Sequence, residues 1–430
     1  MSLEITLFAV IVTIILLATG WVMEYLALLI FSTLIMLLGI SSASVTFSGF
    51  ASAGFWLTFA GMPLNMGIKK TGLADRISLA MMRFFKGKYS VLVLGMVFFG
   101  TVMAFIMPSA MGRVVLMLPI LIEFSRANGF LQGTKGYNGI LLAGLLSTYF
   151  MGSVILPSNL PNLALMGSVK SLYHIDFVYA NYLLLNFPVL GLLKCILLVF
   201  VIDYLFNDLP QKIEIEKEKM LMAFSGSEKR LVIYLLLLLA AWLSDSFTHL
   251  SPAWPALFVA VICLLPKIGI LNHKNFIKES NLEPLFYVGG LIGLSAVVND
   301  TGLGTYLGQH LIALLPMTPG HDAVNFYLLS LLSSVVGIVT TLPGVPAIVT
   351  PLATAIVKTI HLPLMTVLMT QTVGFSNFLL PYQAPPILIA MRLGNIPFKV
   401  VTQLCLIMAM ISVFVLLPIN YYWWKLLHVF

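Results

Sequence analysis

The stretch SVLVLGMVFFGTVMAFIM, residues 90–107, decides the class of fold. It is apolar without alternation, and its length is close to the roughly 20 residues that cross a bilayer as a helix. A strand of a membrane barrel would alternate between apolar and polar residues. Of the 430 residues, 60% are hydrophobic and only 9% are charged, whereas soluble domains are about 25% charged. These features predict an all-α protein that crosses the membrane many times.

Apolar runs of spanning length recur along the chain. They predict membrane spans at 3–20, 24–41, 52–68, 138–168, 176–205, 229–247, 252–267, 284–300, 364–391 and 398–425. Two further runs, 89–124 and 323–360, are interrupted in the middle by Pro and Gly and are predicted to be re-entrant hairpins. The first run carries Glu4 and no preceding basic residue, so it is interpreted as a span rather than a signal peptide.

The basic residues predict the orientation. If residues 69–88 are cytoplasmic, most of the 23 lysines and arginines fall on that side of the membrane. Both termini then lie on the opposite, non-cytoplasmic side, and the expected location is a bacterial inner membrane. The net charge of +7 is thereby explained as a topological signal, so no nucleic-acid partner is expected.

Similar segments occur in both halves of the chain, in the same order. FWLTFAGMPLNMGIKKTGLADRI (55–77) resembles PLFYVGGLIGLSAVVNDTGLGTYL (284–307), and LPSNLPNLALMG (156–167) resembles LPYQAPPILIAM (380–391). The loop after the first Thr-Gly-Leu is basic, whereas residues 301–321 contain no Lys or Arg. Because the flanking charges invert, we expect two repeats of opposite orientation, each with about five spans and one hairpin.

These repeats define the predicted domains. The first repeat covers 1–205, with its hairpin at about 89–124 and a broken helix at about 138–168. Residues 206–228 form a charged cytoplasmic linker. The second repeat covers 229–430. Its hairpin is expected at about 323–360 and its broken helix at about 364–391.

Pro and Gly predict four breaks in the helices, at 108–112, 157–162, 340–346 and 381–386. A break frees backbone N–H groups that attract anions and carbonyl groups that attract cations, and lipid tolerates such backbone only inside the protein. The predicted substrate-binding residues are Arg113, Ser109, Asn159, Asn162, Thr341 and Gln383, and the predicted cation ligands are Ser109, Ser158, Thr340 and Thr341. For each Ser and Thr, the competing interpretation is a hydrogen bond to the preceding helical turn.

Arg113 is the most unusual of these residues. It lies in an apolar run that contains no Asp or Glu to pair with it before Glu123. Intramembrane arginine is costly and is usually functional or paired, so a substrate anion is its expected partner. The alternative is that Arg113 extends along a short hairpin arm to the membrane surface. Lys194 also lies within a span, and for it surface extension or packing is the favoured interpretation.

Some functions are not expected. The sequence has no Walker loop, no Gly-x-Ser-x-Gly and no His-Glu-x-x-His motif, so we predict neither ATP-driven transport nor an enzyme. No carboxylate lies near the centre of a predicted span, which disfavours a proton relay. Cys195, Cys263 and Cys405 are interpreted as buried apolar residues. No cofactor or metal is expected beyond a possible coupling Na⁺.

The matched segments resemble the divalent anion:sodium symporter family of the ion transporter superfamily, over about residues 25–425. The resemblance implies a homodimer in which each transport domain moves past a scaffold domain, as in an elevator mechanism. It also implies that the substrate is a dicarboxylate, citrate or sulfate, carried together with sodium. The family has Ser-Asn-Thr at each hairpin tip, where this chain has Ser109-Ala110-Met111 and Thr341-Leu342-Pro343. We therefore consider that Arg113 replaces a missing cation, which would favour anion exchange or uncoupled anion movement.

The expected function is secondary active transport of a small anion, sodium-coupled or exchanging, by alternating access. Two alternatives remain open. One is a cation/proton antiporter or metalloid efflux carrier of the same superfamily. The other is a membrane enzyme or scaffold that transports nothing.

Overall fold

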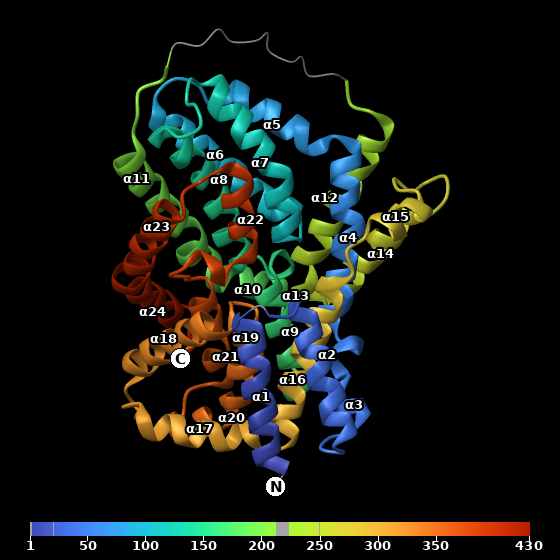
Figure 1. Ribbon diagram of the computed structural model, residues 1–430, viewed down its shortest axis with the longest axis vertical. Coiled ribbons are helices and arrows are strands. Elements are labelled where there is room, and N and C mark those ends of the chain that lie inside the picture. The colour runs from blue at the N-terminus through green and yellow to red at the C-terminus, as the bar shows by residue number, and fades with distance from the viewer. Residues whose placement is uncertain (1, 20, 212–222, 249) are drawn as a thin grey trace.

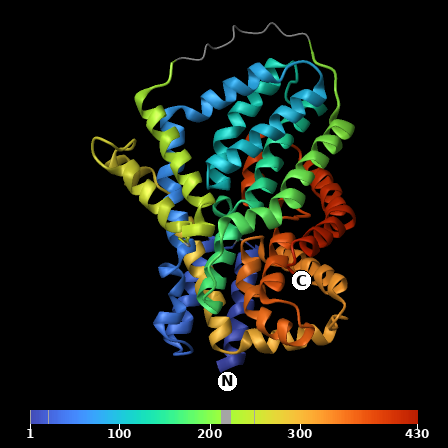
Figure 2. The ribbon, with the colours of Figure 1, turned by 180° about the vertical axis from the view of Figure 1, so that it is seen from behind.

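The computed structural model describes residues 2–19, 21–211, 223–248 and 250–430, which form helices joined by short connections (Figures 1 and 2). The predicted all-α fold is confirmed for this part of the chain. Residues 212–222, which carry most of the charge of the predicted linker, lie outside the described residues.

The helices before the linker are α1 (Ser2–Thr19), α2 (Glu24–Leu37), α3 (Ala43–Thr46), η1 (Ser48–Ala51), α4 (Ala53–Thr71), α5 (Leu73–Phe84), α6 (Tyr89–Ile106), α7 (Ala110–Ala127), α8 (Lys135–Val154), η2 (Leu156–Ser158), α9 (Leu160–Tyr173), α10 (Tyr179–Asn186), η3 (Phe187–Leu193) and α11 (Lys194–Phe206).

Those after it are α12 (Gly226–Leu243), α13 (Asp245–Thr248), α14 (Ala253–Leu264), α15 (His273–Glu279), α16 (Glu283–Asp300), α17 (Leu303–Leu314), α18 (Asp322–Thr340), α19 (Gly344–Val349), η4 (Thr350–Leu352), α20 (Ala353–Ile360), α21 (Leu364–Phe375), η5 (Pro381–Gln383), α22 (Pro385–Gly394), α23 (Phe398–Ile411), η6 (Ser412–Leu416) and α24 (Leu417–Leu426).

Within the described residues, four helical stretches are long and apolar enough to cross a bilayer. They are Tyr89–Ile106, Tyr179–Phe206, Asp322–Thr340 and Phe398–Leu426, and the bent pair Glu283–Asp300 and Leu303–Leu311 makes a fifth. Several other predicted spans are divided into shorter helices. The predicted span 138–168, for example, is α8 followed by η2 and α9, because Pro157 and Pro161 cannot continue the backbone hydrogen bonding of α8.

The same order of elements occurs in both halves. A long helix is followed by a short one across its end, then a helical hairpin, a helix broken by a 3₁₀ turn, and a helix that contains a turn of π-helix. The first set runs from α4 to α11 and the second from α16 to α24. Figure 1 shows α5 across the top of the molecule and α17 across the bottom, so the corresponding short helices lie at opposite ends.

The short helices α5 and α17 correct the sequence-based interpretation, which treats 69–88 and 301–321 as loops. Gly72 and Gly302 adopt left-handed backbone conformations, with φ of 77° and 73°, and turn the chain between the long helix and the short one. The bend between α16 and α17 is 79°. Arg76 holds α5 against the start of α12 through a hydrogen bond from its Nη2 to Glu228 Oε2 at 3.1 Å.

Contacts between the two halves bring the breaks together. The second arm of the first hairpin, α7, packs against α22, which follows the break in the second half. Conversely, α19, just after the tip of the second hairpin, packs against α9, which follows the break in the first half. Each hairpin therefore meets the broken helix of the opposite half as well as that of its own.

The pairing of α6 with α8 depends on Gly100. A Cβ atom there would lie 2.1 Å from Ser147 Oγ and 2.6 Å from the Gly144 carbonyl oxygen, and small residues allow such close approach of membrane helices. We expect Gly100→Ala to destabilise the protein by about 1–3 kcal/mol, measured as a lower thermal unfolding midpoint in detergent. The control is Gly67→Ala, where the nearest atom would be Leu231 Cδ1 at an ordinary 3.6 Å. Equal midpoints for the two variants would contradict this packing.

Candidate functional site

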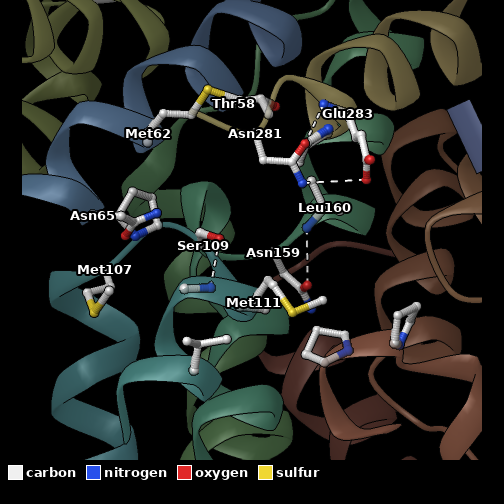
Figure 3. A pocket seen from close by; sticks show the side chains of 18 of the residues that line it. Thr58, Met62, Asn65, Met107, Ser109, Met111, Asn159, Leu160, Asn281 and Glu283 are labelled. Atoms are coloured by element: carbon white, nitrogen blue, oxygen red, sulfur yellow. Dashed lines mark hydrogen bonds between the residues drawn. The ribbon is translucent and has the colours of Figure 1, made fainter. Parts of the chain in front are cut away.

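One cavity touches all four helix breaks. Its volume is about 1320 Å³, and Ser109, Asn159, Pro343 and the pair Pro385–Pro386 contribute one group of lining residues from each break. Figure 3 shows the side chains of α4, of the first hairpin tip and of the break between α8 and α9 around this space. Breaks that are far apart in sequence thus share a single hollow, which the packing of α7 on α22 and of α19 on α9 produces.

The wall of the cavity is mixed in chemistry. Much of it is apolar, and the remaining polar lining includes hydroxyl, amide and phenol groups from Thr58, Asn65, Ser109, Tyr149, Asn159 and Tyr287. Charged lining residues are Glu24, Lys69, Glu279 and Glu283. Lys69 belongs to the segment 69–88, which the sequence predicts to be cytoplasmic. The basic residues Lys267, Lys274 and Lys278 place the segment of Glu279 on the same side, and Glu279 Oε1 accepts a hydrogen bond from Lys70 Nζ at 3.0 Å. Glu283 begins α16, next to such a segment.

Three buried polar atoms of the lining make no hydrogen bond of ordinary geometry with the described residues. They are Asn159 Nδ2, Asn65 Oδ1 and the Tyr287 hydroxyl oxygen. Buried polar atoms are almost always paired in native proteins, and each exception needs an explanation. Asn159 and Tyr287 can donate, so a solute with acceptor oxygens could pair both.

Asn159 is positioned by the start of α9. Its Oδ1 accepts a hydrogen bond from the Leu160 N–H at 3.1 Å, so the acceptor side of the amide caps the helix. The donor side, Nδ2, is left without a partner in the described structure. The residue itself is only 3% exposed. A single side chain therefore fixes the helix end and presents a free donor.

Ser109 is the N-cap of α7. Its Oγ accepts from the Gly112 N–H at 3.1 Å. Ala110 and Met111 follow, and both line the cavity. The first N–H groups of a helix have no partner within that helix, and the helix dipole adds positive potential there. The beginning of α7 thus has the properties of an anion site.

Arg113 differs from its expected role. Its side chain is fully buried and does not line the cavity. Nη1 donates to the carbonyl oxygens of Met107 at 2.5 Å and Ser158 at 2.9 Å, and Nη2 donates to that of Thr148 at 3.2 Å. The guanidinium therefore has backbone carbonyls as partners where the sequence suggested a substrate, and its burial also excludes extension to the membrane surface.

Comparisons with known proteins identify the family. A family model described as the sodium:sulfate symporter transmembrane region matches residues 1–430. This chain belongs to the sodium:sulfate symporter family. The resemblance expected from the sequence is thereby confirmed, and the protein is an integral membrane protein of a family of secondary anion transporters.

Relatives of this symporter-family chain include bacterial transporters. It is 24% identical to the L-tartrate/succinate antiporter of Escherichia coli K12, over 83% of this chain and 75% of that protein. It is 23% identical to a membrane protein of Cupriavidus necator H16, over 79% and 68%. The solved structure of the YdaH transporter of Alcanivorax borkumensis has a similar fold, with a TM-score of 0.57, 14% identity, and coverage of 89% and 88%.

Two other predicted site residues of this symporter-family chain form hydrogen bonds with backbone carbonyls inside the protein. Asn162 does not line the cavity; its Nδ2 donates to the carbonyl oxygens of Gly152 and Ile155, both at 2.9 Å. Ser158 also lies outside the lining. Its hydroxyl donates to the Ala104 carbonyl at 2.5 Å. Both side chains therefore satisfy carbonyls near the ends of α6 and α8.

The second half shows related contacts. The Tyr382 hydroxyl donates to the Ile338 carbonyl near the end of α18, as Ser158 does near the end of α6. Gln383 Oε1 accepts from the Leu379 and Leu380 N–H groups at 2.8 and 2.9 Å. The Thr340 hydroxyl donates to Val336 one turn earlier, which is the competing interpretation given above. None of these residues except Tyr382 is exposed, and none lines the cavity.

Thr341 marks the tip of the second hairpin. Its φ of 67° is unusual for a residue with a β-branched side chain. It lies outside the cavity lining, although Pro343, two residues later, is part of it. Of the predicted ligands, only Ser109 and Asn159 line the cavity. Among the described residues, no group of three or more His, Cys, Asp or Glu could hold a metal ion.

Sequence reasoning did not identify Asn65, Tyr149 and Tyr287 as lining residues. Asn65 and Tyr287 lie in the two similar segments quoted from each half, FWLTFAGMPLNMGIKKTGLADRI and PLFYVGGLIGLSAVVNDTGLGTYL. A polar side chain in an apolar, glycine-containing run was the available signal. That signal is clear for Asn65 and weak for Tyr149 and Tyr287, because tyrosine is common in apolar helices.

Proposed function

We propose that this chain is a secondary transporter that exchanges small dicarboxylate-type anions by alternating access. One observation carries the proposal: all four helix breaks border a single cavity that presents unpaired donors and the N-terminus of α7. Helix breaks at such positions form the substrate sites of transporters. The tartrate/succinate antiporter of E. coli supports dicarboxylates as the first substrate class to test.

The cavity is larger than most small-molecule sites, which measure about 300–1,000 Å³. We interpret it as a binding site that is continuous with an open vestibule. Lys69 and Glu279 lie in segments assigned to the cytoplasm by their positive charge. The state described here is accordingly assigned as open toward the cytoplasm, with both termini on the other side of a bacterial inner membrane.

The proposed mechanism includes two inverted repeats, 1–205 and 229–430, joined by the linker 206–228. Support comes from the repeated order of elements and from the positions of α5 and α17 at opposite ends in Figure 1. An elevator motion and a homodimer are further proposals, which rest on the family alone.

Exchange in proteoliposomes tests the function. Vesicles that contain the purified chain and unlabelled succinate are expected to take up external radiolabelled succinate or tartrate, and unloaded vesicles are not. Sulfate and citrate form parallel arms of the same experiment. Cation-driven proton movement without anion exchange would favour the antiporter alternative. Absence of both activities would contradict a transporter.

A cysteine at the first hairpin tip tests the location of the site. Cys195, Cys263 and Cys405 are buried, so they should react little with a membrane-impermeant thiol reagent. We expect Ser109→Cys to be labelled and a saturating dicarboxylate substrate to slow labelling about tenfold, as occupancy of about 90% would. Labelling is followed by mass spectrometry, with the unmodified chain as control. Labelling at the same rate with and without substrate would place the site elsewhere.

A further inference from the structure

The helix breaks around the cavity also leave backbone carbonyl groups that need a positive partner. Where a membrane helix ends inside the protein, its last carbonyl groups have no N–H partner, and the helix dipole makes that end negative. In transporters, such carbonyls commonly coordinate the coupling Na⁺ or H⁺. In this chain, two basic side chains lie close to the ends of interrupted helices.

In the first half of the chain, the positive group near the breaks is Arg113. Its three acceptors come from separate segments: Met107 follows α6, Thr148 belongs to α8, and Ser158 ends η2. These carbonyls surround one guanidinium in the space where the hairpin tip meets the broken helix. Ser158 and Asn162 satisfy three further carbonyls nearby, those of Ala104, Gly152 and Ile155.

In the second half, the positive group at the end of the broken helix is Lys194. Its Nζ donates to the carbonyl oxygen of Ser376 at 2.7 Å, and Ser376 is the C-cap of α21. The ammonium also lies over the ring of Phe150, 4.3 Å from its centroid. Lys194 is fully buried, which excludes extension to the membrane surface and leaves packing, the other interpretation given above. The residue starts α11 and therefore reaches from the first half of the chain to the broken helix of the second.

Arg113 and Lys194 are alike in burial as well as in their position near helix ends. In the part of the chain that the structure describes, Arg113 and Lys194 are the basic residues that are fully buried, both at 0% exposure. Neither makes an ion pair with a carboxylate among the described residues. Burying an unpaired charge is expensive, so the backbone carbonyl oxygens that Arg113 and Lys194 contact are the compensation that the fold provides.

We infer that Arg113 and Lys194 are built-in replacements for coupling cations, so that this chain stabilises its broken helices and exchanges anions without sodium. A covalently attached cation cannot leave with the substrate. It therefore removes the ion gradient as a driving force and leaves exchange of one anion for another. The statement about exchange rests on the proposed function. The statement about cation binding rests only on the contacts of Arg113 and Lys194.

The first test uses the wild-type protein. Its thermal unfolding midpoint and its succinate exchange are measured in sodium, potassium and N-methyl-D-glucamine chloride at equal ionic strength. We expect the same midpoint and the same exchange rate in all three salts. A saturable rise of the midpoint in sodium alone would overturn the inference, because a bound ion stabilises the folded state. A rate at least tenfold higher in sodium would do the same.

The two readouts separate this inference from the proposed function. If no tested anion exchanges in any salt, the proposed function fails and the midpoint alone decides the cation inference. If exchange occurs only with sodium, the proposed transport stands and the inference fails.

The second test is chemical rescue, in which an added ion replaces a side chain removed by mutation. Arg113→Ala and Lys194→Ala are expected to lower the midpoint and to slow exchange more than tenfold. Guanidinium ion, at concentrations that do not affect the wild-type protein, should restore the first variant at least partly. Methylammonium should restore the second. A loss that is unrelated to the missing cation would not respond to the matching ion.

Lys170→Ala is the control, because Lys170 is an exposed residue that pairs with Asp176 at the end of α9. It removes the same formal charge and is expected to leave the midpoint and exchange unchanged with or without added ions. Failure of both matching ions to act, or equal rescue by the wrong ion, would overturn the inference. Should either alanine variant not fold, the wild-type measurements still decide the matter.

Discussion

Asn159→Asp is expected to weaken binding of the transported anion about 100-fold, with a smaller loss of folding stability than Asn162→Asp because residue 159 borders the cavity. The aspartate keeps an oxygen that accepts from the Leu160 N–H, so the cap of α9 is preserved. It replaces the unpaired Nδ2 donor with a second carboxylate oxygen. Loss of a hydrogen bond to a charged group costs about 1.5–3 kcal/mol, each 1.4 kcal/mol is about tenfold in affinity, and repulsion between like charges adds to the loss.

The measurement is the concentration of substrate that half-saturates exchange in proteoliposomes, together with the unfolding midpoint in detergent. Asn159→Ser is the matched control. It retains an acceptor for the cap and adds no charge, so we expect a smaller loss of affinity. Wild-type affinity in Asn159→Asp would show that this amide does not contact the anion. A large fall in the midpoint would show that its main role is structural.

Asn162→Asp is expected to act mainly on folding, with a loss of folding stability of about 3–5 kcal/mol. Asn162 is fully buried, and its Nδ2 is the donor to the Gly152 and Ile155 carbonyls. An aspartate would direct a carboxylate oxygen at two carbonyl oxygens and leave a buried charge uncompensated, which is strongly destabilising. The outcome is followed by the unfolding midpoint and by the fraction of monodisperse protein after size-exclusion chromatography.

The two asparagines make a sharp comparison because they are three residues apart and receive the same substitution. The sequence treats them alike, as polar residues near Pro161. In the structure, Asn159 lines the cavity and Asn162 faces the end of α8. If Asn162→Asp folded normally and lost only affinity for the anion, the assignment of the two roles would be wrong.

Much of the fold is predictable because the signals are local. A run such as residues 90–107 has no alternative to a membrane helix, since lipid leaves no other partner for its backbone groups. Pro157 and Pro161 interrupt the helix wherever it is placed in the protein, and the predicted break 157–162 overlaps the gap between α8 and α9. The tip of the first hairpin is likewise found where Pro108 and Ser109 predicted it.

The partners of Arg113 were less predictable. The sequence indicates that an arginine in an apolar run needs compensation, and the absence of a nearby carboxylate suggested a substrate anion. The actual acceptors, Met107, Thr148 and Ser158, are backbone carbonyls that any residue carries, so no sequence pattern identifies them. For the same reason, the contact of Lys194 with Ser376 could not be anticipated.

The amino-acid sequence by itself determined that this chain is helical, lies in a membrane, is interrupted at four places, and belongs among the relatives of the anion symporters. Those properties follow from hydrophobicity and from the backbone chemistry of proline and glycine, which act over a few residues. Only the tertiary structure decided which break faces which, and which polar atoms remain free in the cavity. That outcome depends on the packing of α7 on α22 and of α19 on α9, contacts between residues far apart in the chain.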